Sequence, residues 1–197
     1  MGFPHCGMSW EQPDMSDSPK RLTVEEYADL PDDGTWNELI NGEIVRFPFP
    51  DFRHGLVCGH VLGEFGNNVR TDRLGYACAN TGVITSRNPD SVRGADLAFW
   101  LRDRVLKPIP QGYFEPPPDI VVEVKSRFDE WPVWSAKIAA FRACGVKIVT
   151  AIDPALRQAV HYRVGQPEKV VDASGTLDYT DVLPGLLVTM EMILSRQ

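Results

Sequence analysis

The segment Asp119-Ile-Val-Val-Glu-Val-Lys-Ser126 carries most of the information about the fold of this chain. Its four apolar residues are all β-branched and follow three prolines at 116–118, a pattern that predicts a central strand buried on both faces. Glu123 and Lys125 interrupt the apolar run, and the two-residue alternation of a strand directs both side chains to the same side of the sheet. Because burial of an unpaired charge costs several kcal/mol, these residues either pair with each other or serve a metal ion or a substrate.

A second strand-like segment, Ala95–Trp100, also carries an acid among apolar residues. Its Asp96 precedes Glu123 by about 27 residues. An Asp on one strand and a Glu-x-Lys on another form a pattern that is typical of a metal site. Asp119 does not belong to this pattern, because four residues along a strand separate it from Glu123 by about 13 Å.

These segments resemble the PD-(D/E)XK nuclease superfamily and, more closely, its "Putative restriction endonuclease" family. The similarity covers roughly residues 21–195. It rests on five segments that occur in order: Leu30–Gly34, Asn37–Glu43, Asp96–Phe99, Pro118–Ser126 and Gly145–Val149. Each segment alone is weak evidence for the resemblance, but five of them in the same order are specific. The chain departs from the family at Ala95, where the family usually has the Pro of its name; that Pro binds nothing, so the metal site remains possible.

The resemblance implies an α/β fold, a restriction-endonuclease-like core in which a central mixed β-sheet is flanked by helices. We expect one such domain over residues 21–197, since 197 residues with 43% hydrophobic composition suffice for one well-buried core. Residues 1–20 mix Gly, Pro, Met, Ser and Asp without periodicity and are expected to be a disordered leader.

Local patterns predict the remaining elements. Thr23-Val-Glu-Glu26 has the form of a capping box, and Asn41-Gly42 is a strong hairpin signal. The expected elements are a helix from Thr23, a hairpin of 36–40 and 43–47, a helix over 51–70, a hairpin of 75–79 and 83–86, a Pro-rich loop over 102–118, a helix from Trp131, strands over 147–152, 159–164 and 169–172, and a short strand and helix over 186–195. We expect the Pro-rich loop to shape the entrance of the site.

The acids suggest a site for a hard divalent ion. Phosphodiester hydrolysis needs an activated water and neutralised phosphate charge, and Mg²⁺, for which Mn²⁺ could substitute, supplies both. Asp96, Glu123 and the carbonyl group of Val124 form a sparse oxygen ligand set of the kind that suits Mg²⁺. Glu38 lies where the family has a catalytic acid, and it could hold a second ion or a metal-bound water; an exposed position at a sheet edge is the alternative.

Two lysines compete for the catalytic role. Lys125 would orient or deprotonate the attacking water and offset charge on the phosphate. Lys137 lies close to the buried stripe of the helix that starts at Trp131, and in some family members a lysine at this helix position replaces the strand lysine. The expected catalytic residues are Glu38, Asp96, Glu123, Lys125 and Lys137, and we expect Lys125 to have the larger role.

His54 lies on the apolar stripe of the helix over 51–70, so its side chain is expected to face the sheet. A core histidine with satisfied hydrogen bonds and a contact to phosphate or water near the start of the helix both fit this position.

The formal net charge of −7 argues against sequence-independent binding to nucleic acid, which depends on lysine and arginine. A cleft can nevertheless be locally basic. Five basic residues surround the Asp96 strand and could supply this charge: Arg87, Arg93, Arg102, Arg104 and Lys107.

Composition also bears on location and on other metals. No segment has the roughly 20 apolar residues of a membrane helix, and the amino terminus has no signal-peptide pattern, so a cytoplasmic protein is expected. The four cysteines have no C-x-x-C spacing and are expected to be free thiols. With four histidines in the chain, the sequence argues against a zinc site.

The leading hypothesis is a Mg²⁺-dependent endonuclease that hydrolyses phosphodiester bonds of DNA as a homodimer. The alternative is a catalytically inactive nuclease-fold module that binds DNA or another protein. In a third hypothesis, Glu123 and Lys125 are only a structural pair, which leaves Asp96 unexplained.

Overall fold

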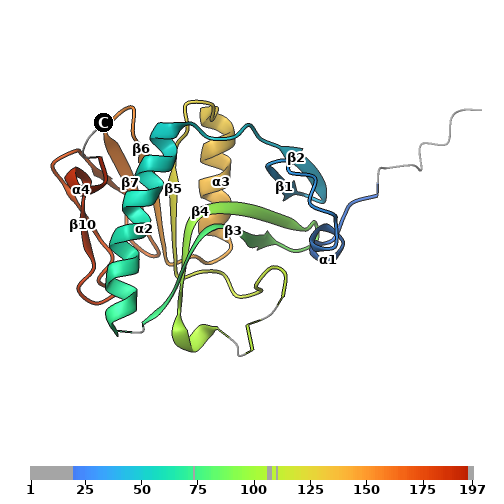
Figure 1. The fold of residues 1–197 in the computed structure, drawn as a ribbon, viewed down its shortest axis with the longest axis horizontal. Coiled ribbons are helices and arrows are strands. Elements are labelled where there is room, and N and C mark those ends of the chain that lie inside the picture. Colours follow the sequence, from blue (N-terminus) through green and yellow to red (C-terminus); the bar gives the residue numbers. More distant parts are fainter. Residues whose placement is uncertain (1–19, 73, 106–107, 110, 195–197) are drawn as a thin grey trace, which may run out of the picture.

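The computed structural model describes residues 20–72, 74–105, 108–109 and 111–194, and Figure 1 shows its fold. The disordered leader expected at 1–20 lies outside the described residues, apart from Lys20. In the described part, an eight-stranded sheet packs against α2 (Phe52–Asp72) on one face and α3 (Trp131–Ala143) on the other. The expected α/β architecture is therefore confirmed.

The sheet is mixed. Its strands are β1 (Asn37–Ile40), β2 (Glu43–Arg46), β3 (Gly75–Ser86), β4 (Ser91–Leu101), β5 (Ile120–Val124), β6 (Ile148–Asp153), β7 (Gln158–Arg163) and β8 (Lys169–Val171). The main path runs β2-β1-β4-β5-β6-β7-β8, and β3 pairs with β4 outside this path. The β5–β6 pair is parallel and the other pairs are antiparallel.

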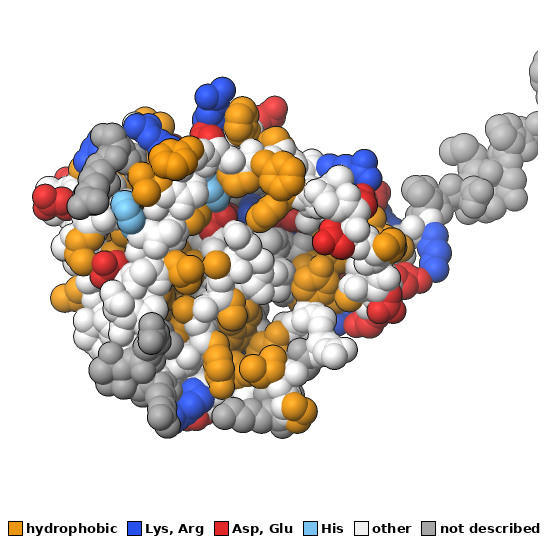
Figure 2. Space-filling view, viewed as in Figure 1, with side chains coloured by type: hydrophobic (Ala, Val, Ile, Leu, Met, Phe, Trp, Pro, Cys, Tyr) orange, Lys and Arg blue, Asp and Glu red, His pale blue; other side chains and the backbone are white. Residues whose placement is uncertain are grey.

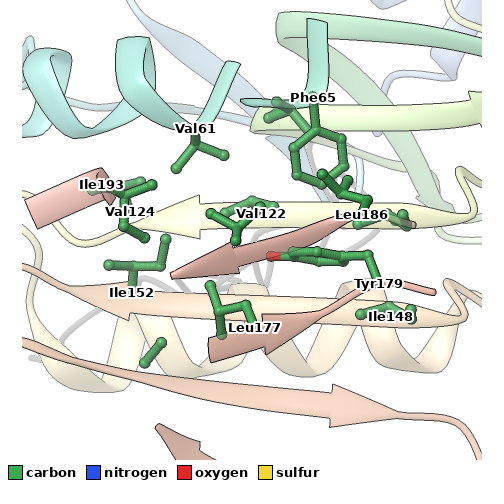
Figure 3. Close-up of a cluster of buried hydrophobic side chains, with 14 of the residues drawn as sticks. Val61, Phe65, Val122, Val124, Ile148, Ile152, Leu177, Tyr179, Leu186 and Ile193 are labelled. Carbon is green, nitrogen blue, oxygen red and sulfur yellow. The ribbon is translucent and has the colours of Figure 1, made fainter. Parts of the chain in front are cut away.

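The central strand β5 is buried along its whole length, as its β-branched sequence predicts. Val122 and Val124 belong to the core beneath α2, whereas Val121 belongs to the core beneath α3. Figure 3 shows Val61 and Phe65 of α2 directed at the first of these two cores. Because β5 contributes side chains to both cores, it fixes the positions of α2 and α3 on the two faces of the sheet.

Several local signals fold as expected. Helix α1 (Val24–Ala28) begins at a capping box between Thr23 and Glu26. The β1–β2 hairpin turns at Asn41 and Gly42, whose φ angles of 52° and 81° explain why Asn-Gly occupies this turn.

The predicted hairpin of 75–79 and 83–86 is wrong, because one continuous strand, β3, covers both segments. Its pairing with β4 continues from Ala79↔Leu97 to Thr81↔Ala95. Asn80 between them accommodates a φ of 47° within the strand. The chain reverses instead at residues 87–90, where β3 leads into β4.

The carboxy-terminal segment adds a small two-stranded sheet and a helix to the core, and the sequence predicted only some of these elements. The short strand β10 (Leu187–Thr189) and helix α4 (Met190–Leu194) were expected, but β9 (Thr176–Asp178), the partner of β10, was missed. Figure 3 shows Leu177, Tyr179 and Leu186 packed beside Val122. This unit completes the core on the α2 side of the sheet.

The loop after β4 begins with the short helix η1 (Arg102–Arg104), and its described residues do not line the hollow that holds Glu38, Asp96 and Glu123. Its described residues Val105, Tyr113 and Phe114 line a different hollow, against Trp100 and β3. For the described residues of this loop, the expectation that it shapes the site entrance is wrong, because their aromatic side chains pack on the sheet. Among the described residues, no helix has both the length and the apolar character that crossing a membrane requires.

A buried hydrogen-bond chain joins β6 and β7 to the segment after β9. The Tyr179 hydroxyl donates to Thr150 Oγ1 at 2.9 Å, and Thr150 Oγ1 lies 2.9 Å from Nδ1 of His161. Nε2 of His161 lies 3.1 Å from the carbonyl oxygen of Asp178. Because a carbonyl oxygen only accepts, Nε2 carries the ring proton and Nδ1 accepts from Thr150. Burial lowers the pKa of His161 to about 4.

The buried hydrogen-bond chain through His161 predicts that the protein loses stability in mild acid. The folded state favours the neutral His161 ring, so its contribution is complete above the ordinary pKa of 6.5 and is lost as pH falls toward about 4. We expect His161 to lower the free energy of unfolding by on the order of 3 kcal/mol over this range. Urea unfolding of the wild type and of His161→Gln at a series of pH values measures the effect.

The variant is needed because His54 titrates in the opposite sense, its pKa being raised. The difference between the two proteins isolates the contribution of His161. An identical pH dependence in both would contradict the assignment.

Candidate active site

One hollow of about 60 Å³ brings together acids from three strands and a lysine from α3. Its charged and titratable lining includes Glu38, His54, Arg93, Asp96, Glu123 and Lys137. Exposed aromatic residues lie where α2 and α3 begin, with Phe52 85% and Trp131 59% exposed. Figure 2 shows apolar side chains gathered along this edge of the molecule.

Asp96 and Glu123 are brought together by the register of β4 and β5. The last paired residues are Leu97 and Val122, so the next positions along the two strands are Asp96 and Glu123. Here the side chains take over the backbone hydrogen bonds: Asp96 N–H donates to Glu123 Oε1 at 3.2 Å, and Val124 N–H donates to Asp96 Oδ2 at 2.7 Å. The two carboxylates are therefore fixed to the end of the strand pair.

Glu38 reaches the same hollow from β1, so its edge-exposed alternative does not hold; its exposure is 3%. Its Oε1 accepts from Gly94 N–H at 3.0 Å and lies 3.3 Å from Lys137 Nζ. Its Oε2 lies 2.6 Å from Arg93 Nε, in an ion pair without hydrogen-bond alignment. Glu38 is thus held between two cations.

Lys137 links the acids from the opposite side. Its Nζ lies 2.8 Å from Glu123 Oε2 as well as 3.3 Å from Glu38 Oε1. Burial alone would lower the pKa of Lys137, but the charges of Glu123, Glu38 and Asp96 raise it well above its usual range. Lys137 therefore stays charged within the cluster.

The cluster contains more acid than base. If these three carboxylates are ionised and the His54 ring is neutral, Arg93 and Lys137 leave one negative charge uncompensated. Burial raises the pKa of Glu123 to about 8; Lys137 opposes this rise, and the charges of Asp96 and Glu38 add to it. An additional cation would relieve this repulsion, and carboxylate oxygens are the donors that hard cations such as Mg²⁺ prefer. The side chains present therefore fit a magnesium ion.

His54 is buried, as expected, and approaches Asp96. Its Nε2 lies 3.2 Å from Asp96 Oδ1, while Asp51 caps the start of α2 by accepting from the His54 backbone N–H at 2.9 Å. Burial alone would lower the pKa of His54, but the hydrogen bond and charge of Asp96, with Glu123 and Asp129, raise it. The ring therefore supports the carboxylate from the α2 side.

Lys125 is not brought into this cluster. Strand β5 ends at Val124, after which the Lys125 side chain donates to the carbonyl oxygen of Ser126 at 3.4 Å. It lines a neighbouring hollow with Phe52 and Asp153. The strand alternation that placed Lys125 beside Glu123 no longer applies beyond the end of the strand.

Arg93 is a charged residue of the hollow to which the sequence assigned no site role, whereas His54 was left between a core position and a contact to phosphate or water. Arg93 was counted only as nearby positive charge, yet it is 6% exposed and its Nη2 has no hydrogen-bond partner among the described atoms. A charged residue within an apolar strand was the available signal, as it was for Asp96. The other expected basic residues that are described pair elsewhere: Arg87 with Glu25, Asp90 and Glu115, Arg102 with Asp103, and Arg104 with Asp119.

Asp119 lies outside the hollow, at the opposite end of β5 from Glu123. It is fully buried, and its carboxylate pairs with Arg104 at 2.7 Å and Lys147 at 2.8 Å. Lys107 lies outside the described residues.

The fold is similar to that of a solved protein. The crystal structure of "a putative nuclease belonging to DUF820" from Anabaena variabilis superposes with a TM-score of 0.76 and 20% sequence identity. The match covers 88% of this chain and 98% of that chain, so the two share their fold over nearly the whole domain. A search of curated proteins gave no match.

A comparison with family models gives a match over residues 24–191, to the Uma2 family with the description "Putative restriction endonuclease". These residues contain all three acids and Lys137. Because the match spans most of the sequence, and the fold agrees, the chain belongs to the Uma2 family of putative restriction endonucleases.

Proposed function

We propose that this protein is a metal-dependent endonuclease that hydrolyses phosphodiester bonds of DNA. The observation that carries the proposal is the contact of Lys137 with Glu123 at 2.8 Å, in the same hollow as Asp96. Purely structural ion pairs seldom leave an excess acid in a buried hollow, because an uncompensated buried charge is costly. An excess acid is expected, in contrast, at a site that binds a cation.

Asp96, Glu123 and the carbonyl group of Val124 would hold Mg²⁺ or Mn²⁺, with Glu38 as a further ligand or as a partner of a bound water. Bound there, the ion would activate water and neutralise charge on the phosphate. The chain itself fixes the ligands: Val124 N–H holds one oxygen of Asp96, and Asp96 N–H holds one oxygen of Glu123. Such fixed donors avoid reorganisation during the reaction.

Lys137 is the favoured catalytic lysine of the two candidates. Its buried ammonium lies among the acids, where low solvent access strengthens its interaction with negative charge that develops on a phosphate. Arg93 lines the same hollow with an unpartnered Nη2 and can donate to a phosphate oxygen. Lys125 remains a candidate only if the segment after β5 rearranges around the substrate.

The proposal extends to the oligomeric state and the location of the protein. Cutting both strands of a duplex requires two hydrolysis events, and a symmetric homodimer would supply two equivalent sites. A cytoplasmic location would give access to DNA. The inactive module is the second candidate, and the net charge of −7 favours it, since the outer surface offers little general attraction for nucleic acid.

DNA cleavage is predicted to depend on a divalent metal ion. We expect DNA cleavage with Mg²⁺ or Mn²⁺ and none in EDTA, because the proposed ligands are oxygen atoms. Asp96→Asn and Glu123→Gln should each reduce the rate to background, since each removes a negatively charged ligand. Cleavage of supercoiled plasmid, followed on agarose gels with correctly folded variants, measures the effect. Activity that persists in chelator, or in both variants, would refute the assignment.

Substitution of each lysine shows which of the two contributes to catalysis. We expect Lys137→Met to lower the single-turnover cleavage rate by roughly 100-fold or more, as for loss of one preorganised charge-stabilising group. Lys125→Met is the matched control and should cost roughly tenfold or less, because its ammonium lies outside the acid cluster. Circular dichroism checks that both variants fold.

The substitution at Lys137 also leaves Glu123 and Glu38 without a cation and could reduce stability. Lys137→Arg keeps the charge and separates this effect from catalysis. If Lys125→Met is the inactive protein and Lys137→Met remains active, the catalytic role belongs to the strand lysine, and the structure must differ at that segment when substrate is bound.

A further inference from the structure

Beside the acid cluster, α2 presents an imidazole and a thiol to Asp96. His54 and Cys58 are four residues apart and therefore share one face of the helix. The Cys58 sulfur lies 3.6 Å from Nδ1 and 3.7 Å from Nε2 of His54. One ligand atom from each of the three residues falls within 4.8 Å of the others. Neither the sequence hypotheses nor the magnesium site uses the thiol.

These separations match those between the ligand atoms of a tetrahedral zinc ion. With Zn–N and Zn–O bonds of about 2.0 Å and a Zn–S bond of about 2.3 Å, a nitrogen and an oxygen ligand lie about 3.3 Å apart and a nitrogen and a sulfur ligand about 3.5 Å apart. In the structure, Nε2 of His54 lies 3.2 Å from Asp96 Oδ1 and 3.7 Å from Cys58 Sγ. The His54–Asp96 and His54–Cys58 pairs thus have the spacing of zinc ligands, and the Asp96 oxygen and the Cys58 sulfur lie within 4.8 Å of each other.

We propose, against the expectation drawn from the small number of histidines, that His54, Cys58 and Asp96 form a zinc-binding site that shares Asp96 with the acid cluster. The nitrogen, sulfur and oxygen donors form a set that zinc prefers and magnesium does not. Three protein ligands leave a fourth position for a water molecule, and two of the three, His54 and Asp96, border the hollow. On binding, zinc displaces the thiol proton of Cys58, which passes to solvent.

The local electrostatics also favour a cation. Asp96 and Glu123 place negative charge near the Cys58 sulfur, although burial, the larger cause of the raised pKa of this thiol, opposes the loss of its proton. The same negative potential attracts a divalent ion. The three ligands approach from α2 and β4, so the site depends on the packing of this helix on the sheet.

The consequence for activity rests on the proposed function. Zinc bound to Asp96 would withdraw that carboxylate from magnesium, so the two ions would compete for one ligand. The site would then make the nuclease sensitive to a transition metal through a residue, Cys58, that the hydrolysis itself does not need as a ligand.

Binding can be tested with metal alone, without substrate or magnesium. Co²⁺ titrated into the reduced full chain should give a thiolate-to-cobalt charge-transfer band at one equivalent, and Zn²⁺ should abolish it by displacement. Cys58→Ser should lose the band. Cys78→Ser is the matched control and should keep it, as should Cys6→Ser, which tests the neighbouring His5–Cys6 pair as a competing site.

A second measurement does not depend on removing the thiol. Asp96→Asn should weaken zinc binding at least tenfold in competition with a chromophoric chelator, with the exposed Asp103→Asn as an acidic control that should not. A band that survives in Cys58→Ser, or unchanged zinc affinity in Asp96→Asn, would overturn the proposal. Either outcome is independent of hydrolysis, so failure here is distinguishable from failure of the nuclease assignment in the EDTA experiment.

Discussion

The replacement of one backbone rung by two carboxylates at the end of the β4–β5 pair is the constraint on which the site depends. Beyond Leu97↔Val122, the Asp96 side chain accepts from Val124 N–H, and the Glu123 side chain accepts from Asp96 N–H. The acids thus satisfy backbone donors that would otherwise be buried without partners. The same bonds hold the carboxylates at a fixed separation, so strand pairing and site geometry have a single cause.

Burial of this much charge has a cost that the surroundings offset only in part. Glu38 receives Arg93 and Lys137, and Lys137 also contacts Glu123, yet Asp96 depends on His54 and on a backbone N–H. Replacing a buried ion network with well-packed apolar residues is often neutral or stabilising. Stability alone therefore does not account for the cluster, whereas the proposed binding of a cation and a phosphate would.

Most of the fold could be predicted where one local signal determines the structure. The capping box at Thr23, the Asn-Gly turn and the β-branched run of β5 each behave as expected. The failures depend on distant contacts. Thr81 continues the β3 strand because Ala95 pairs with it, and β9 forms because β10 lies beside it. A turn-rich or short segment carries no local record of such partners, so its sequence alone favours a loop.

The two lysines show the same limit within the site. Alternation correctly predicts the face of Glu123, but the rule holds only while the chain remains a strand, and β5 ends at Val124. Whether Lys125 or Lys137 joins the acids is then decided by where α3 crosses the sheet. That crossing is set by Trp134, Ile138 and Phe141, the buried stripe of α3 that packs on the core containing Val121. Lys137 comes directly before Ile138 of this stripe. The apolar packing of the helix therefore determines that the Lys137 ammonium lies beside Glu123.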